Sequence, residues 1–265
     1  MALLYPQYLV WRRTMEGVHS ADDCFSKKMM NRMRKSWKVL ADSPYRLVRD
    51  EIVDDTYLNQ FVPLYEKHIG AKKNGHIYPV RERVHEGQAK GHIYEALSLY
   101  QDEVLIGGFI YSIRRDALSA CFRAFPHELP LALPLSVSHL AEHLYFARAL
   151  ELGKHYLRHG KDRNAYGLHS NIGLAEYKLR LGCDPWVSQS EDTTLLPVPP
   201  SCEGTDALFF LHATKDKVPM REALLVSDKS TEELLTAFPT LLGSPERCRV
   251  TRVRHEDLPS FLAKY

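Results

Sequence analysis

Two histidines and a glutamate at close spacing form the first group of residues that could carry chemistry. His139, Glu142 and His143 follow the pattern His-x-x-Glu-His, which on a helix places both imidazoles on one face. Such a pair can bind zinc, with the glutamate beside the metal as a general base. The sequence marks no third carboxylate ligand, so we favour partly exposed helix histidines and predict no metal site.

A concentration of basic residues near the N-terminus suggests a different chemistry, the binding of phosphates. Residues 1–50 carry ten lysines and arginines against five acidic residues, although the net charge of the whole chain is only +2. A positive segment of this kind can contact a phosphate-bearing partner, and a solvated helix face is the structural alternative. The residues that we assign to this cluster are Lys27, Lys28, Arg32, Arg34 and Lys35.

Composition and cysteine spacing restrict the class of protein. A chain of 265 residues that is 45% hydrophobic and 26% charged is typical of a globular protein, which excludes fibrous and wholly disordered classes. The five cysteines show no Cys-x-x-Cys spacing, so we predict neither a disulfide framework nor a zinc ribbon. Pro6 interrupts the apolar N-terminal stretch, and arginines follow it rather than precede it, unlike in a secretory signal. We therefore expect a soluble, cytoplasmic protein without a membrane-spanning helix.

A helical pattern over residues 22–41 must position the basic cluster. Phe25, Met29, Met33 and Trp37 recur at four-residue spacing and form the expected apolar stripe of this helix. The basic side chains fall largely off that stripe, so we expect them on the side of the helix that faces solvent.

Three consecutive strands in the middle of the chain are the clearest secondary-structure pattern. We expect strands over 93–101, 104–114 and 118–125, joined by tight polar turns into an antiparallel meander. Gly107 and Gly108 interrupt the second strand. They indicate a bulge, a close approach of a ligand to the backbone, or simple packing against a neighbouring element.

Helices and strands alternate after the meander. We expect a long helix over 136–159, a short strand over 164–168 and a second helix over 171–181. Ser230 and Glu233 form a capping box that predicts a later helix. A meander followed by interleaved helices and strands predicts a mixed α/β fold.

Three segments of the chain resemble families of acyl-transferring enzymes. The segment from Gly173 to Gly182, GLAEYKLRLG, resembles the Gly-Leu-x-x-Phe-Lys-x-x-Phe-Gly signature of Fem-type aminoacyltransferases, and BioF-like acyltransferases carry a similar Tyr-Lys-x-x-x-Gly. Residues 26–35 resemble a basic helix near the start of those families, and residues 64–79 resemble part of the protein arginyl and leucyl transferases. The resemblance runs in order over residues 20–213.

The resemblance implies a GNAT-like fold, which is an α/β (α+β) arrangement of a mixed, mostly antiparallel, splayed sheet flanked by helices. We expect a GNAT-like acyltransferase domain over residues 1–213 and a C-terminal α/β extension, residues 214–265, packed on it. Members that use acetyl-CoA bind its pyrophosphate with a glycine-containing loop before the long helix. Residues 131–138 read LALPLSVS and contain no glycine, as in relatives that use aminoacyl-tRNA.

The resemblance also implies an enzyme that forms an amide or ester by acyl transfer. The activated acyl or aminoacyl group would come from aminoacyl-tRNA and pass to a small-molecule or peptide amine. An acyl-CoA or carrier-thioester donor is one alternative, and a catalytically inactive GNAT-like module that binds RNA or a protein is an alternative of another class. In each enzymatic case the donor is a co-substrate, and no permanently bound cofactor is expected.

The expected site residues follow from the resemblance and from the predicted strands. Lys178 is the candidate catalytic residue, as a cation that orients the donor or stabilises developing negative charge. The basic cluster provides the candidate contacts to tRNA phosphates. The candidate substrate-binding residues are Gly107, Gly108, Arg123, His169 and Tyr177. The sequence does not predict an oligomeric state.

Overall fold

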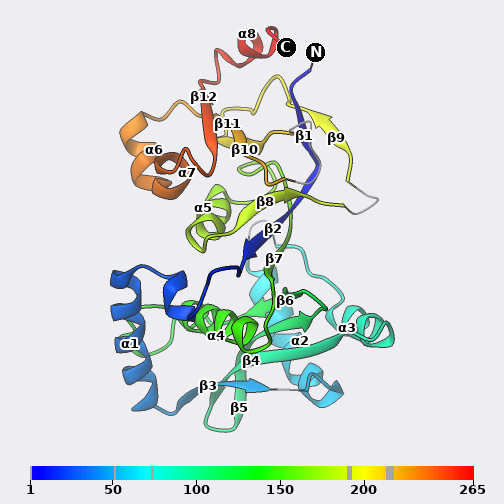
Figure 1. Cartoon of the computed structure of the whole chain (residues 1–265), viewed down its shortest axis with the longest axis vertical. Helices are drawn as coiled ribbons and strands as arrows, with labels where there is room; N and C mark the ends of the chain where they lie inside the picture. The colour runs from blue at the N-terminus through cyan, green and yellow to red at the C-terminus, as the bar shows by residue number, and fades with distance from the viewer. Residues whose placement is uncertain (1, 51, 73–74, 190–192, 213–217) are drawn as a thin grey trace. The chain divides into compact units, whose positions relative to one another are not determined.

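The computed structural model of the chain contains two compact units (Figure 1). The described residues are 2–50, 52–72, 75–189, 193–212 and 218–265. Residues 14–158 form the central unit, and residues 1–13 together with 159–265 form the terminal unit. Strand β7 (Tyr156–Arg163) begins in the central unit and ends in the terminal unit.

This division differs from the boundary expected at residue 213. Strand β10 (Ala207–Phe210) precedes that boundary, and its antiparallel partner β11 (Glu222–Val226) follows it. Because a sheet cannot be divided between its paired strands without losing their hydrogen bonds, residues 222–226 and 249–253 complete a sheet of the terminal unit. The assignment of acyltransferase activity to residues 1–213 stays a prediction.

The central unit is built on the expected antiparallel meander, flanked by helices. Its helical segments are η1 (Ala21–Cys24), α1 (Lys27–Ala41), α2 (Asp55–Gly70), α3 (Val80–Ala89) and α4 (Val137–Glu151). Its strands are β3 (Tyr45–Asp50), β4 (Ile93–Gln101), β5 (Val104–Ile113), β6 (Ala117–Ala124) and the start of β7. Strands β3 to β6 pair antiparallel in chain order. The predicted mixed fold with a mostly antiparallel, helix-flanked sheet is therefore confirmed.

Strand β7 joins this sheet through a short parallel pairing. The paired residues run from Ala117 opposite Tyr156 to Ser119 opposite Arg158. Strand β6 itself continues to Ala124, where it is still paired with β5. A short pairing between two longer strands is what a splayed sheet would produce.

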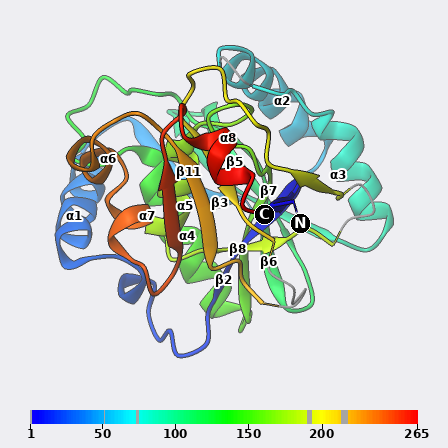
Figure 2. The same cartoon turned by 90° about the horizontal axis from the view of Figure 1, so that it is seen from above.

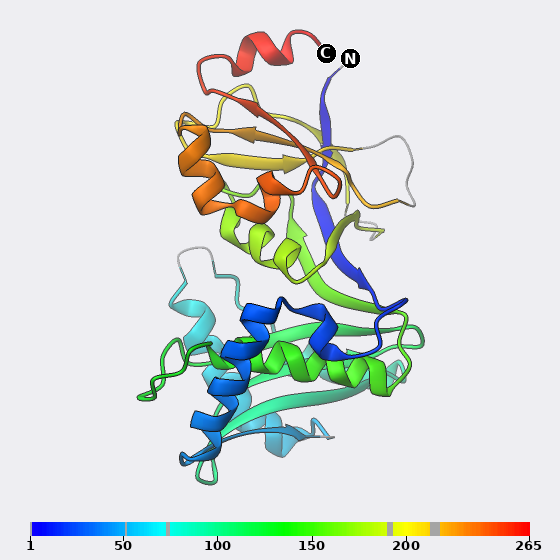
Figure 3. The ribbon, with the colours of Figure 1, turned by 60° about the vertical axis from the view of Figure 1, so that its left-hand side comes forward.

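Alternate side chains of the sheet face two different helical layers. Ile110 of β5 belongs to the core that includes Phe61 of α2. Its neighbours Phe109 and Tyr111 face the other way, and their ring centroids lie 5.0 and 5.2 Å from that of Tyr145 on α4. Figure 3 shows α4 running along the sheet. The period of two along a strand thus places the α2 and α4 helices on opposite faces.

The terminal unit contains several short strands and short helices. Its remaining strands are β1 (Leu4–Pro6), β2 (Tyr8–Thr14), β8 (Asp184–Val187), β9 (Leu195–Pro197) and β12 (Arg249–Val253). Its helices are α5 (Ile172–Arg180), α6 (Thr231–Ala237), α7 (Pro239–Gly243) and α8 (Leu258–Leu262). Strand β1 pairs with β9, β2 lies between β7 and β8, and the order β10-β11-β12 forms the third sheet. Leu258 of α8 is buried in the core that includes residues of β10, β11 and β12. Figure 2 shows α8 in red near the C-terminus.

Two predicted elements differ from the structure. The long helix expected over 136–159 ends at Glu151, because Gly153 adopts a φ of 58° and β7 follows. The strand expected over 164–168 is a bend and a turn in which Tyr166 forms an isolated bridge with Leu208. No helix in the described part of the chain is both long and apolar enough to cross a membrane.

Candidate functional site

Helix α5 carries Lys178 and is bounded by strong local signals. The side chain of Asn171 accepts a hydrogen bond from the Gly173 N–H at 2.7 Å, which caps the N-terminus of the helix. Gly182 follows the C-terminus with a φ of 80°, a left-handed conformation that favours glycine. The helix expected over 171–181 is therefore present as a nine-residue helix, with the expected glycine after it.

Lys178 is buried and bound to a carboxylate. Its Nζ donates a hydrogen bond to Oδ2 of Asp162 on β7 at 2.7 Å. The side chains of Lys178 and Asp162 are only 8% and 11% exposed. Charges with so little access to water are stable when they are paired, so each side chain holds the other in place. Lys178 is therefore not an exposed lysine on the surface of its helix.

Two further donors fix the position of Asp162. Trp11 Nε1 and the Tyr166 hydroxyl each donate a hydrogen bond to Asp162 Oδ2 at 2.8 Å. Burial, together with the charge of Asp162, raises the pKa of Tyr166 well above its ordinary value, so this phenol remains protonated. One carboxylate oxygen thus accepts three hydrogen bonds, which come from three different parts of the chain.

Aromatic rings surround this polar group. The ring centroid of Trp11 lies 5.5 Å from that of Phe210 and 6.5 Å from that of Tyr166, both in edge-on contact. Lys178 Nζ lies 5.8 Å from the Trp11 centroid, within the range of a cation–π interaction. Trp11, Tyr166 and Phe210 are fully buried, so the Lys178–Asp162 pair rests on a close-packed support.

Residues 240–247 contact α5 at Glu176 and Leu179, away from the Lys178–Asp162 pair. The buried carboxylate of Glu176 accepts hydrogen bonds from the Thr240 and Leu241 N–H groups at 3.0 and 2.8 Å, at the N-terminus of α7. Arg247 donates to the Leu179 carbonyl at 2.6 Å. The sequence did not predict a role for residues 214–265, and these contacts show that the segment positions the helix of Lys178.

The other candidate substrate-binding residues are divided between the two units. His169 and Tyr177 belong to the terminal unit with Lys178, whereas Gly107, Gly108 and Arg123 belong to the central unit. His169 is exposed in the turn that follows Tyr166, and Tyr177 is half-buried on α5.

Packing and a bulge account for the glycine pair in β5. A Cβ atom at Gly107 would lie 2.8 Å from the Ala124 carbonyl oxygen, and one at Gly108 would lie 2.5 Å from the Tyr57 hydroxyl. The register between β4 and β5 shifts beside Gly107 and leaves Ile106 as the extra residue. Two of the three explanations offered by the sequence are therefore present, and substrate binding at these glycines stays a prediction.

The His-x-x-Glu-His pattern lies on α4, but its side chains have different partners. Glu142 is fully buried and pairs with Arg123 of β6 at 2.5 Å. His143 Nε2 lies 2.8 Å from Asp22, and His139 Nδ1 lies 2.8 Å from the Ser136 hydroxyl. The described residues contain no group of three or more His, Cys, Asp or Glu side chains that could hold a metal ion.

Helix α1 exposes the basic cluster, but its buried stripe differs from the expected one. The buried residues are Met30, Met33, Ser36 and Leu40, whereas Met29 and Trp37 are only partly covered. A strict four-residue spacing drifts by about 40° per step around a helix with 3.6 residues per turn, so the buried stripe follows mixed spacings of three and four.

The lysines of the cluster occupy the centre of the exposed face of α1. Lys27, Lys28 and Lys35 are exposed and have no carboxylate partner among the described residues. At the edges of this face, Arg34 pairs with Asp22 at 3.3 Å, and Arg32 donates a hydrogen bond to the Pro134 carbonyl.

The loop before α4 uses two of its backbone amides within the protein. The Leu135 N–H donates to the Ser36 hydroxyl at 2.9 Å, and the Leu133 N–H donates to the Leu131 carbonyl at 2.8 Å. A groove of about 290 Å³ lies beside this loop. Its lining residues are Pro126, His127, Glu128, Leu129, Leu131, Leu133, Ser136 and Val137. These two amides are therefore not available to a pyrophosphate at this loop.

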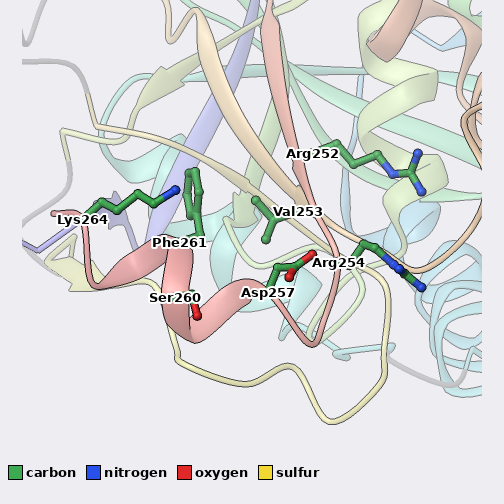
Figure 4. A pocket seen from close by; sticks show the side chains of 7 residues that line it. All are labelled: Arg252, Val253, Arg254, Asp257, Ser260, Phe261 and Lys264. Atoms are coloured by element: carbon green, nitrogen blue, oxygen red, sulfur yellow. The ribbon is translucent and has the colours of Figure 1, made fainter.

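A second groove, of about 490 Å³, lies between β12 and α8 (Figure 4). Arg252 and Arg254 extend away from Phe261, and Arg252 donates a hydrogen bond to the Thr231 hydroxyl at 2.9 Å. Arg254 pairs with Glu256 at 2.8 Å. The groove contains none of the candidate site residues, and we assign no function to it.

Comparisons with known proteins found similar folds among solved structures. No family model matches the chain, and no curated protein matches it. L-PGS from Bacillus licheniformis is 13% identical over 69% of this chain and 58% of its own, with a TM-score of 0.44. A tandem GNAT protein from the clavulanic acid biosynthesis pathway is 15% identical over 74% of this chain and 55% of its own, with a TM-score of 0.43. The chain thus spans less than two thirds of the length of these structures.

Proposed function

We propose that this protein is a GNAT-like acyltransferase that moves an aminoacyl group from aminoacyl-tRNA to an amine acceptor. The proposal depends above all on Lys178, a nearly buried cation on the helix whose sequence resembles the Fem-type signature. Its ion pair with Asp162 fixes the ammonium group before any substrate arrives. A cation that is already oriented stabilises charge in a transition state without further reorganisation.

The reaction would need few protein groups. The acceptor amine attacks the ester carbonyl carbon, a C–N bond forms, and the negative charge that develops on the carbonyl oxygen is stabilised by Lys178. The C–O bond to the tRNA ribose then breaks, and one amine proton is transferred to the departing oxygen. Trp11, Tyr166 and Lys178 each donate a hydrogen bond to Asp162 Oδ2, so we assign Asp162 a positioning role.

The loop before α4 favours aminoacyl-tRNA over an acyl-CoA donor. Its Leu133 and Leu135 amides are engaged within the protein, and Glu128 lies at the adjacent groove. These two amides are therefore not available to the adenosine diphosphate part of CoA. We propose Gly107, Gly108, Arg123, His169 and Tyr177 as further contacts to the substrates.

The exposed lysines of α1 give the proposal a binding test. Replacing Lys27, Lys28 and Lys35 together by Ala should weaken the binding of tRNA, because three phosphate contacts and their counterions are lost. The plot of log K against log salt concentration should become shallower by roughly 2 to 3 units. Filter binding at several salt concentrations measures this slope, with Lys264→Ala as the control. An unchanged slope would show that the cluster is only a solvated face.

A transfer assay tests the role of Lys178. The full chain is incubated with total tRNA charged with labelled amino acids and with glycinamide as a small amine acceptor. Lys178→Ala should lower the rate of transfer at least tenfold, which corresponds to about 1.4 kcal/mol of barrier. Lys264→Ala, at an exposed position, should leave the rate unchanged.

The outcomes of this assay distinguish the alternatives. Consumption of acyl-CoA instead of charged tRNA would establish the thioester-dependent reaction. Consumption of neither donor would favour the inactive binding module. A native melting curve for Lys178→Ala with full turnover would remove Lys178 from the site.

A further inference from the structure

The Lys178–Asp162 pair has hydrogen-bonding capacity that the protein does not use. The three donors to Asp162, from Trp11, Tyr166 and Lys178, all bind Oδ2. Within the described part of the chain, Oδ1 has no partner, and Lys178 Nζ donates only to Asp162. An ammonium group has three donors, so two remain. The pair therefore offers one fixed acceptor beside two donors.

The orientation of the unused oxygen is determined by the fold. Trp11 and Tyr166 are fully buried, and both bind Oδ2, so the carboxylate plane of Asp162 cannot rotate without breaking their hydrogen bonds. Side-chain exposures of 11% for Asp162 and 8% for Lys178 leave both groups a small contact with solvent. An acceptor and a cation held in this way select a ligand that carries a donor next to an acceptor.

We propose that Asp162 Oδ1 binds the α-ammonium group of the aminoacyl donor while Lys178 binds its carbonyl oxygen. This inference rests on the proposed function and specifies its substrate class. In an α-amino ester, standard bond lengths bring the ammonium nitrogen and the carbonyl oxygen within about 3 Å of each other. One carboxylate oxygen and one neighbouring ammonium can therefore bind both groups at once.

This arrangement discriminates against donors without an α-amine. A simple acyl group can accept a hydrogen bond from Lys178 but offers no donor to Oδ1. Oδ1 would then lose its water when the ligand binds and would gain no partner, which is the situation in which a polar site rejects an analogue. Asp162 is thus a specificity-determining residue that selects aminoacyl over plain acyl donors.

Binding of small amides tests the inference without any turnover. Isothermal titration of the full chain compares L-alaninamide, L-leucinamide and L-lysinamide with the matching amides that lack the α-amine. At least one amino-acid amide should bind ten or more times more tightly than its counterpart. Equal affinities for the two kinds of amide, or no binding of any amide up to its solubility, would overturn the inference.

An isosteric variant assigns the effect to Asp162. Asp162→Asn keeps the shape and an oxygen for Trp11 and Tyr166, and it should reduce the preference for the amine to less than threefold. Asp42→Asn, at an exposed position, should keep the preference of the wild type. A preference that survives in a folded Asp162→Asn protein would contradict the assignment.

The wild-type protein provides a measurement that does not depend on the folding of a variant. The α-amine of an amino-acid amide loses its proton near pH 8, so its binding should weaken between pH 7 and 9, whereas binding of the matching amide should not. A flat profile for both would contradict the inference. Selective binding of amides that carry the α-amine, without transfer from charged tRNA, would support this subsite and overturn the proposed function. Transfer from charged tRNA without selectivity for the α-amine would overturn only the subsite.

Discussion

At the scale of single residues, ion pairs organise the polar interior of both units. Lys178 pairs with Asp162 in the terminal unit, and Arg123 pairs with Glu142 in the central unit. Removing one member of such a pair leaves a buried charge without a partner, which is more costly than removing both. Melting curves must therefore accompany every activity measurement on Lys178.

A histidine in the terminal unit should make stability depend on pH. The hydrogen bond to the Thr205 carbonyl, followed by the bond and charge of Asp228, raises the pKa of His255 above 6.5. The folded state therefore binds the proton more tightly than the unfolded state. This stabilisation is complete below about pH 6.5 and is lost as the pH rises through the raised pKa.

The His255→Gln variant isolates this contribution. Its melting temperature should fall below that of the wild type at pH 6, and the difference should shrink towards pH 8.5. The control His127→Gln, at an exposed histidine, should show a difference that does not change with pH. A constant difference for His255→Gln would mean that the residue contributes only by packing.

At the scale of elements, the position of α5 relative to β7 depends on the turn that connects them. Gly167 lies in the turn between β7 and α5 with a φ of 89°, and a Cβ atom there would lie 1.8 Å from the Asp206 carbonyl oxygen. Gly160, within β7, has a similar φ of 83°, but a Cβ atom added there would have no heavy atom within 4 Å. The two glycines share the conformational constraint and differ only in the space around them.

This pair separates the two costs of adding a methyl group. Gly160→Ala should lower the free energy of unfolding by about 1 to 2 kcal/mol, because only the left-handed conformation is penalised. Gly167→Ala should cost at least about 2 kcal/mol more, because the backbone at Asp206 must move. Urea unfolding of both variants measures the difference. Equal costs would show that the turn at Gly167 adjusts freely.

At the scale of the whole molecule, each unit has a hydrophobic core that is built from its own residues. Trp11 is fully buried in the terminal unit, although it lies near the N-terminus, and Phe61 is fully buried in the central unit. The N-terminal strands thus belong to the unit formed by the end of the chain. Regions with separate cores can open independently of each other.

Hydrogen exchange should show this independence. Trp11→Ala and Phe61→Ala each remove a large buried ring, at a cost of about 3 to 5 kcal/mol. In Trp11→Ala the amides of residues 159–265 should lose protection, whereas in Phe61→Ala the loss should fall on residues 14–158. Loss of protection across both units in each variant would indicate a single cooperative unit.

Several elements could be predicted from the sequence because short-range signals in the chain determine them. The turns of the meander, the capping box of Ser230 and Glu233 and the glycine after α5 all depend on residues that are near one another in the chain. The exposed basic face of α1 was also predicted, because amphipathic spacing places charged residues away from the core. The predicted set of buried residues on that helix was wrong, because which residues are buried depends on the elements that pack against the helix.

The sequence by itself determined the helix that carries Lys178, the glycine that ends it and the mixed α/β class of the fold. Only the tertiary structure placed Asp162 beside Lys178, and Trp11, which is 151 residues away in sequence, beside Asp162. No local pattern marks these partners, because their contacts depend on how β2, β7 and α5 pack together. A buried charge is stable only with its partner, so the packing of the terminal unit decides the chemistry of this site.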